Sequence, residues 1–231
     1  MIYQFTILSI LRLIIVVTGL ALVPCLLLPV TSRAVLKFWA QLTLVAAKYL
    51  LGVATRIEGV QHLPRNNGYI IAAKHQSLWE TLVLILQIPK AIFIVKRQLL
   101  QIPIFGWYLY RSGAIGINRR NPLTALKQMP YQAKLWHERG YNIIIFPEGT
   151  RTKPGAKVKY HAGIKLLYQY LKCPVLPAAT NSGCYWYGNK VKAGVIILKF
   201  LPEINYGLPA AEFMAKLEHD LEITSKNLAN D

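Results

Sequence analysis

Apolar positions are distributed differently in the first fifty residues and in the rest of the chain. Residues 13–30 form an uncharged, almost wholly apolar run of eighteen residues, which is at the lower limit for crossing a bilayer. Pro24 and Pro29 interrupt this run, and proline inside a helix kinks or ends it. Residues 34–53 predict a second helix with one basic and one apolar side, which suits a membrane interface or packing against the first helix. The two segments predict an N-terminal membrane-associated helical hairpin.

Two other interpretations of these segments remain open. Arg12 followed by an apolar centre is also typical of a secretory signal peptide, although no clear small-x-small cleavage site follows. Short runs broken by proline also occur as buried core helices. Basic residues follow the apolar run at Arg33, Lys37 and Lys48, whereas only Arg12 precedes it. The positive-inside rule therefore predicts that the bulk of a membrane-bound chain faces the cytoplasm.

From about Arg56 onward, short apolar runs alternate with segments of helical spacing. Strands separated by helices are typical of an α/β sheet with helices on its faces. We therefore expect an N-terminal membrane-binding part at residues 1–52 and an α/β domain at residues 53–231. We expect strands at residues 69–73, 91–95, 114–117, 142–146, 175–179 and 195–200, and helices at residues 123–139, 162–171 and 212–228.

Composition and charge narrow the choice of partners. Charged residues make up 16% of the chain, against roughly 25% in an ordinary soluble domain. The formal net charge of +17 favours an anionic partner, such as nucleic acid, an anionic membrane surface or a phosphorylated substrate. Three irregularly spaced cysteines argue against a disulfide framework and against a four-ligand metal site. We expect neither a metal nor a cofactor.

The first candidate for catalytic chemistry is His75 with Glu80. Residues five apart on a helix point about 140° away from each other, so the pair can meet only if His75 precedes the helix. Ser77 and Glu80 form a capping-box pattern, with Ser77 as N-cap, and this places His75 in the preceding loop. A histidine oriented by a carboxylate is a suitable base for acyl transfer to an alcohol. The alternative is a plain capping box with an unrelated loop histidine.

A second polar cluster directly follows the buried strand predicted at residues 142–146. Glu148, Gly149, Thr150 and Arg151 lie where α/β proteins place ligand sites, and the arginine offers a planar fork for a phosphate. The alternative is a surface pair of Glu148 with Arg151 in an ordinary turn. Other candidate cations for an anionic ligand follow two further predicted strands, namely Lys96, Arg97 and Arg119.

Taken together, these segments resemble the lysophospholipid acyltransferase family, and most closely its bacterial 1-acyl-sn-glycerol-3-phosphate acyltransferases. Residues 75–80 resemble the family's H-x-x-x-x-D block, and residues 146–151 match its F-P-E-G-T-R block intact. Residues 113–119 resemble a block whose terminal arginine helps to bind the acceptor phosphate, and residues 175–178 resemble an apolar block associated with the acyl site. The similarity covers residues from about 53 to 179. It implies a mixed, mostly parallel sheet flanked by helices, preceded by membrane-binding helices.

The resemblance implies a reaction. His75, oriented by Glu80, would deprotonate the sn-2 hydroxyl of lysophosphatidic acid, and the oxygen would attack the thioester of acyl-CoA or acyl carrier protein, giving phosphatidic acid. Arg119 and Arg151 would hold the acceptor phosphate, and Glu148 would order its loop or bind the glycerol part. The implied location is the bacterial inner membrane with the catalytic domain in the cytoplasm, and nucleic acid is not an expected partner.

Two positions depart from the family pattern. Position 80 is Glu where the family usually has Asp, and position 74 is Lys where Asn is common. These changes leave open an acyltransferase that acts on another lysolipid acceptor. A non-catalytic protein that binds anionic lipid or nucleic acid is the alternative from a different class, but it leaves the His75 and Glu148 segments unexplained.

Overall fold

A computed structural model describes residues 2–66, 68–118, 122–156 and 158–230 of the chain. Its centre is a seven-stranded sheet in the order β1-β9-β6-β2-β5-β3-β4. Five of the six neighbouring pairs are parallel and only β6 with β9 is antiparallel, so the expected mixed, mostly parallel sheet is confirmed. The strands are β1 (Val53–Glu58), β2 (Ile70–Ala73), β3 (Ala91–Lys96), β4 (Ile115–Ile117), β5 (Asn142–Ile145), β6 (Val175–Thr180) and β9 (Gly194–Phe200).

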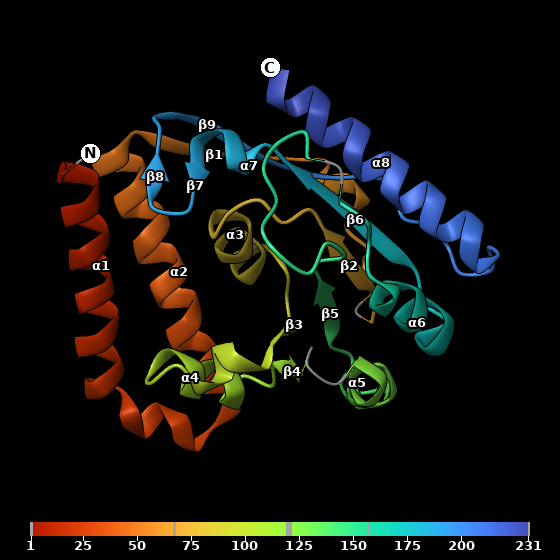
Figure 1. Ribbon diagram of the computed structural model, residues 1–231. Helices are drawn as coiled ribbons and strands as arrows, with labels where there is room; N and C mark the ends of the chain where they lie inside the picture. The colour runs from red at the N-terminus through yellow and green to blue at the C-terminus, as the bar shows by residue number, and fades with distance from the viewer. Residues whose placement is uncertain (1, 67, 119–121, 157, 231) are drawn as a thin grey trace.

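Helices cover both faces of this sheet (Figure 1). Side chains alternate along β2, so Ile70 and Ala72 pack on one face while Ile71 and Ala73 pack on the other. Because both faces are covered, every residue of β2, β5 and β6 is buried, as expected for central parallel strands. One face is covered by α5 (Pro122–His137), α6 (Ala162–Leu171) and α8 (Ala210–Asn230), and the other by α1 (Ile2–Ala21), α2 (Pro29–Leu51) and α3 (Trp79–Gln87).

The N-terminal segment forms two helices joined by a proline-containing corner. The apolar run at residues 13–30 is not one helix, because α1 ends at Ala21, a 3₁₀ helix (η1) spans Val23–Leu27, and α2 begins at Pro29. Both prolines lie in the first turn of a helical segment, where a missing N–H costs nothing. In the described part of the chain, α2 is the one helix long and apolar enough to cross a membrane, with mean hydropathy 1.3 and 44% of its most apolar stretch buried.

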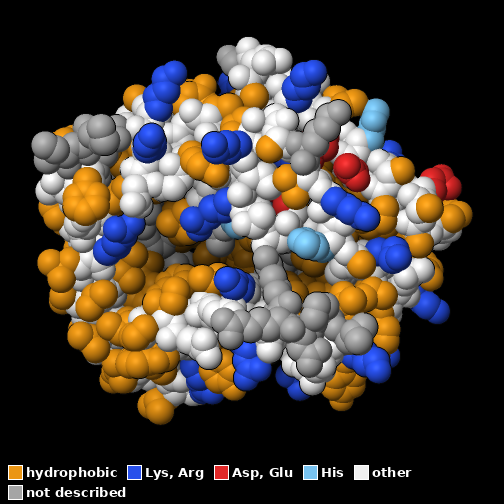
Figure 2. Space-filling view, viewed as in Figure 1, with side chains coloured by type: hydrophobic (Ala, Val, Ile, Leu, Met, Phe, Trp, Pro, Cys, Tyr) orange, Lys and Arg blue, Asp and Glu red, His pale blue; other side chains and the backbone are white. Residues whose placement is uncertain are grey.

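Hydrophobic side chains are exposed along one side of the molecule. Figure 2 shows them gathered over the side formed by α1, η1 and α4 (Phe105–Arg111), while Lys and Arg side chains are spread over the rest of that view. Leu27, in the corner, is 77% exposed. Other exposed apolar side chains of this surface are Phe5, Leu13, Val17, Leu20, Leu28, Val30, Trp107 and Tyr110.

Most expected elements of the α/β part are present, and helix 162–171 has its expected bounds. The pattern did not predict β1, α4, or the hairpin of β7 (Trp186–Tyr187) and β8 (Lys190–Val191). The short helix α7 (Ser182–Tyr185) was also missed. These missed elements are short or lie at an edge of the sheet, and they contain too few residues to show a clear hydrophobic pattern.

Candidate active site

Four neighbouring strands bring the candidate residues to one edge of the sheet. Strands β2, β5, β3 and β4 are adjacent and parallel, so their carboxyl ends meet at the same edge. His75 follows β2, Glu148 follows β5, and Arg97 follows β3. This is the edge where open α/β sheets bind their ligands.

His75 lies in the loop between β2 and α3, as the pattern of residues predicted. Its Nδ1 is 2.8 Å from Oε1 of Glu80, so the ring donates to the carboxylate. Phe146 stacks on the imidazole with 4.1 Å between ring centroids and an interplanar angle of 21°. The His75 side chain is 16% exposed, and no hydrogen bond to its Nε2 is found among the described residues. The imidazole is thus held through Nδ1, while Nε2 can accept a proton.

The Glu80 carboxylate is fully buried and surrounded by donors. Oε1 also accepts the backbone N–H groups of Gln76 (2.9 Å) and Ser77 (2.8 Å), and Oε2 accepts the hydroxyls of Ser77 and Ser182, each at 2.7 Å. Burial raises the pKa of Glu80, but the hydrogen bonds from His75, Ser182 and Ser77 and the attraction of His75 outweigh it, so the pKa lies below its ordinary value. Glu80 is therefore an ionised partner for the histidine.

The helix start differs from the predicted capping box by one residue. Helix α3 begins at Trp79 with Leu78 as its N-cap, whereas Ser77 was expected in that position. Ser77 still accepts the backbone N–H of Trp79 at 2.9 Å, and Glu80 still reaches back to the Ser77 N–H. The capping contacts and the contact with His75 therefore coexist in one carboxylate, so the two interpretations of the segment do not exclude each other.

Glu148 is buried, and both of its oxygens contact protein groups. Oε2 accepts the backbone N–H of His75 at 2.7 Å, while Oε1 accepts the hydroxyl of Thr152 at 2.7 Å and lies 2.6 Å from Nζ of Lys74. Thr152 in turn donates its backbone N–H to the His75 carbonyl at 2.8 Å. Of the two roles considered for Glu148, this geometry favours ordering of the loops over contact with a substrate. The alternative interpretation, a surface pair of Glu148 with Arg151, is wrong, because Glu148 is buried and its ion pair among the described residues is with Lys74.

The rest of this loop faces outward. Gly149 has φ 67°, a left-handed conformation that glycine adopts without strain. Thr150 and Arg151 are exposed, and no hydrogen bond or ion pair of Arg151 is found in the described part of the chain. The guanidinium is therefore free to bind an anion from solvent.

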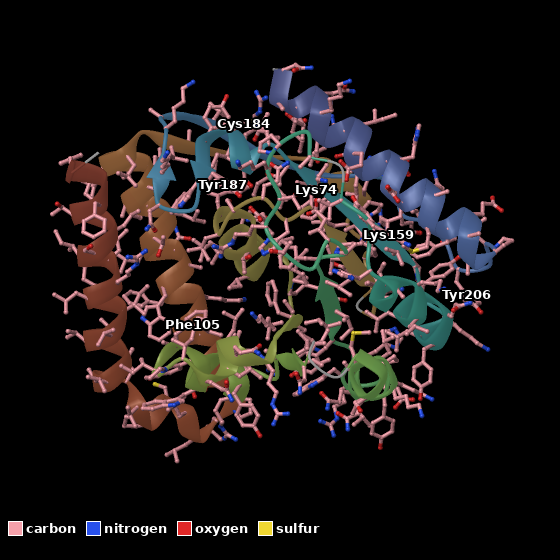
Figure 3. The ribbon with its side chains drawn as sticks, in the orientation of Figure 1. Lys74, Phe105, Lys159, Cys184, Tyr187 and Tyr206 are labelled. Carbon is pink, nitrogen blue, oxygen red and sulfur yellow. The ribbon has the colours of Figure 1, made fainter. Side chains whose placement is uncertain are left out.

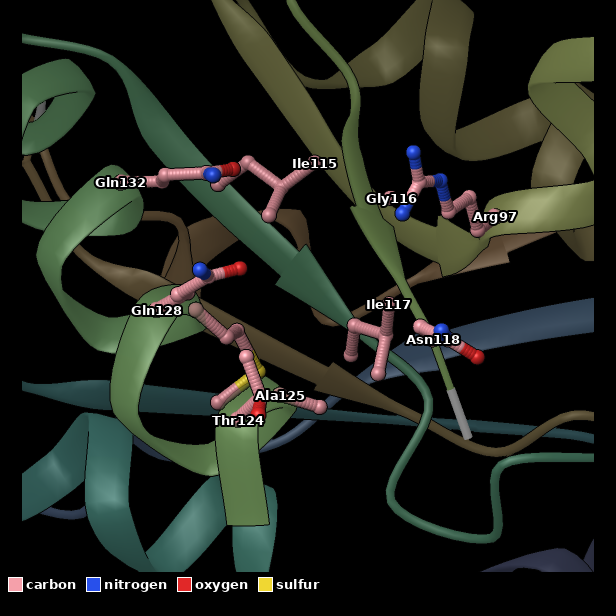
Figure 4. Close-up of a pocket in the computed structure, with 10 residues that line it drawn as sticks. Arg97, Ile115, Gly116, Ile117, Asn118, Thr124, Ala125, Gln128 and Gln132 are labelled. Carbon is pink, nitrogen blue, oxygen red and sulfur yellow. The ribbon is translucent and has the colours of Figure 1, made fainter. Parts of the chain in front are cut away.

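A polar pocket of about 190 Å³ lies between β4 and α5 at the same edge of the sheet (Figure 4). Arg97 lines it together with Asn118, Gln128 and Gln132. Lys96 is exposed beside Arg97, and neither cation has an ion pair among the described residues. Arg119, which was expected to bind the acceptor phosphate, lies outside the described residues. Within the described residues, no group of three His, Cys, Asp or Glu side chains is placed to hold a metal ion.

Several residues that support this site were not singled out from the sequence. Ser182 bonds Glu80 from 102 positions away, and no local pattern indicates such a contact. Thr152 lies just beyond the motif that drew attention to Glu148. In the sequence, Lys74 stands out only as a departure from the family pattern. Its position directly before His75 could have indicated that it supports the site.

Comparisons with known proteins agree with this geometry. The family model described as Acyltransferase matches residues 54–181, more than half of the chain. The 1-acyl-sn-glycerol-3-phosphate acyltransferase of Pseudomonas aeruginosa is 35% identical over 154 residues, which cover 67% of this chain and 60% of that protein. The human 1-acyl-sn-glycerol-3-phosphate acyltransferase alpha is 27% identical over 168 residues, covering 71% of this chain and 59% of the human protein.

A solved structure shares the whole fold. The crystal structure of the 1-acyl-sn-glycerophosphate (LPA) acyltransferase of Thermotoga maritima superimposes with a TM-score of 0.76 at 21% sequence identity, covering 98% of this chain and 96% of that chain. The likeness therefore includes the N-terminal helices as well as the sheet. With the matching family model and the histidine–carboxylate pair at the sheet edge, it follows that this chain belongs to the acyltransferase family.

Proposed function

We propose that this protein transfers an acyl group from an acyl thioester to the sn-2 hydroxyl of 1-acyl-sn-glycerol 3-phosphate, giving phosphatidic acid. The observation that carries the proposal is the 2.8 Å contact between His75 Nδ1 and the buried, ionised Glu80 at the ligand-binding edge of the sheet. The acceptor is inferred from relatives that are named for this activity. The chain spans about 60% of the length of these relatives.

His75 acts as the general base in this mechanism. Its Nε2 takes the proton of the acceptor hydroxyl as the oxygen attacks the thioester carbonyl, and Glu80 stabilises the imidazolium that forms. When the tetrahedral intermediate collapses, the carbon–sulfur bond breaks and the imidazolium returns the proton to the leaving thiolate. No protein nucleophile is needed, because the acceptor oxygen attacks directly.

The exposed cations along the sheet edge bind the acceptor phosphate. Arg151 and Arg97 have no other partner in the described part of the chain, and a guanidinium binds a phosphate through two parallel hydrogen bonds. Lys96 completes this set, and Gly149 and Thr150 shape the loop beside it. Arg119, which lies outside the described residues, is expected to bind the same phosphate because residues 113–119 resemble the family's phosphate-binding block. Glu148 keeps the loop fixed and takes no part in substrate contact.

Residues 1–52 form the membrane-binding part and residues 53–231 the catalytic domain. The exposed apolar side chains of α1, η1 and α4 bind the bilayer, where the lipid acceptor and product reside. By the positive-inside rule, the basic residues that follow the first helix favour a catalytic domain on the cytoplasmic side of the bacterial inner membrane, within reach of acyl-CoA or acyl carrier protein.

The test is a membrane-fraction assay with lysophosphatidic acid and a radiolabelled acyl thioester. The wild-type chain should make phosphatidic acid, and His75→Ala should lose roughly 10²- to 10⁴-fold in turnover, the usual contribution of a general base. His219→Ala, which removes an exposed histidine of α8, is the matched control and should be unaffected. Equal product from all three chains would contradict the role of His75.

The choice of acceptor and donor is tested in the same assay. If folded wild-type protein makes no product with either acyl-CoA or acyl carrier protein, lysophosphatidic acid is not the acceptor. Lysolipids with larger head groups would then be compared as acceptors, with His75→Ala again as the control for the mechanism.

A further inference from the structure

The residue before the catalytic histidine is a buried lysine. Lys74, labelled in Figure 3, has a side chain that is only 3% exposed. Its Nζ lies 2.6 Å from Oε1 of Glu148 and also pairs with Oε1 of Glu222, which is a residue of the C-terminal helix α8. A lysine is almost never buried unless it is paired, so the two carboxylates account for its position.

These contacts form a continuous connection from α8 to the histidine. Tyr160 donates its hydroxyl to Oε1 of Glu222 at 3.0 Å, which holds that carboxylate toward Lys74. Lys74 holds Glu148, and Glu148 accepts the backbone N–H of His75. The loop that carries His75 is therefore connected to a carboxylate of α8 that is about 150 residues away in the sequence.

A second contact joins α8 to the other carboxylate of the site. Asn181 donates to the backbone carbonyl of Leu228, near the end of α8, at 2.9 Å. The next residue is Ser182, whose hydroxyl donates to Oε2 of Glu80 at 2.7 Å. Helix α8 thus reaches both Glu148 and Glu80 through one intermediate segment each, while its apolar side packs on the sheet (Figure 1).

From these contacts we infer that Lys74 and Glu222, a residue of α8, are positioning residues that set the place of His75 through Glu148. The inference rests on the proposed function. Neither residue touches the reacting atoms, so both act on the turnover number and leave the KM values for acceptor and donor nearly unchanged. Lys74 spans two carboxylates because its side chain is long, and an asparagine in its place is too short to reach both.

A double-mutant cycle tests this coupling. Glu222→Gln removes the charge that pairs with Lys74 and should lower kcat about tenfold, the size expected for one charged hydrogen bond. In a Lys74→Asn background, where the link to α8 is already broken, the same change should have no further effect. Asp220→Asn, which alters a carboxylate of α8 that pairs with Lys216, is the matched control and should leave kcat unchanged.

Equal effects of Glu222→Gln in both backgrounds, or no effect in the wild-type background, would overturn the inference. The absence of an effect in the wild-type background can be measured even if Lys74→Asn fails to fold. Glu222→Gln itself should fold, because Glu222 is partly exposed and glutamine has the same shape. Melting temperatures of each variant separate a loss of folded protein from a loss of positioning.

A second readout does not depend on the substrate. The rate at which diethyl pyrocarbonate modifies His75, followed by mass spectrometry, reports the accessibility and placement of the ring. Glu222→Gln should change this rate at His75 and leave it unchanged at His62, which lies in the segment between β1 and β2. An unchanged rate at His75 would overturn the inference, whereas a changed rate in a protein that makes no phosphatidic acid would support it and contradict the proposed acceptor.

Discussion

The residues around the base and the cations around the proposed acceptor site are organised in opposite ways. His75, Glu80 and Glu148, here called the base cluster, are held by buried or partly buried hydrogen bonds among three separate segments of the chain, namely residues 75–80, residues 148–152 and Ser182. Lys96, Arg97 and Arg151, here called the open cations, are exposed and have no ion pair among the described residues. One group is assembled before any substrate arrives, and the other is left open for a substrate to complete.

This difference separates two kinds of kinetic effect. A preorganised base contributes to the transition state at no reorganisation cost, so changes in the base cluster should lower kcat. A cation that binds the phosphate equally well before and during the reaction contributes uniform binding, so its loss should raise KM. Substitutions in the base cluster and at the open cations should therefore change different kinetic constants.

The largest effect is expected for Glu80→Gln. The glutamine keeps the shape but loses the charge, and its amide no longer fixes the histidine tautomer or stabilises the imidazolium. Turnover should fall roughly 100-fold or more, with KM for both substrates nearly unchanged. Steady-state kinetics of the purified variant measure this, with Glu58→Gln, a surface carboxylate of β1, as the control. If Glu80→Gln kept wild-type turnover, the base cluster would not differ from the open cations in its effect on kcat.

Arg151→Ala should produce the opposite kind of change. Loss of a charged, two-point contact to phosphate should raise KM for the acceptor about tenfold while kcat and the donor KM stay close to wild type. Arg56→Ala, which removes an exposed arginine of β1 paired with Glu58, is the control. A fall in kcat at unchanged KM would mean that Arg151 belongs functionally with the base cluster.

Thr152→Val tests a supporting contact of the base cluster. The threonine hydroxyl donates to Glu148 and its backbone N–H donates to the His75 carbonyl, and valine removes only the first of these. We expect kcat to fall about fivefold, in line with the loss of one hydrogen bond. Ser182→Ala should give a change of similar size through Glu80. Unchanged kcat in both variants would show that the base cluster does not need its full set of donors.

The last expected effect concerns stability and its dependence on pH, not the kinetic constants. The pKa of Glu80 is lowered in the folded protein, so its contribution to the free energy of unfolding is present above its ordinary value of 4.5 and is lost as the pH falls through the lowered value. The free energy of unfolding of the wild-type protein should exceed that of Glu80→Gln by about 1–3 kcal/mol at neutral pH, and this difference should shrink in acid. Chemical denaturation at several pH values measures it, and a gap independent of pH would mean that the folded carboxyl is not ionised.

The sequence predicted the centre of the molecule better than its periphery. Buried runs such as Asn142–Ile145 have a single reasonable interpretation as central strands, and the spacing of residues 162–171 marks both ends of α6. Helix α4 was missed because it is seven residues long and follows Ile104, which has φ 66°, a backbone conformation that no local pattern of this sequence indicates.

The site, too, was predicted only in part from the sequence. The pairing of His75 with Glu80 could be predicted because both residues lie in one loop and the start of one helix. The partners of Glu80 and Lys74 on α7 and α8 could not be predicted, because these contacts join segments more than 100 residues apart and depend on how the helices pack on the sheet. Sequence motifs thus identified the proposed reacting groups, but not the residues that hold them in place.

The burial of Lys74 against Glu148 has a consequence for ionic strength. At physiological salt, the field of an exposed charge is screened within about 8 Å, whereas a buried pair is screened much less. Added salt should therefore weaken capture of the acceptor by the open cations and leave the alignment of the histidine intact. An enzyme built this way would lose affinity for its lipid as the salt concentration rises, yet turn over each bound molecule at the same rate.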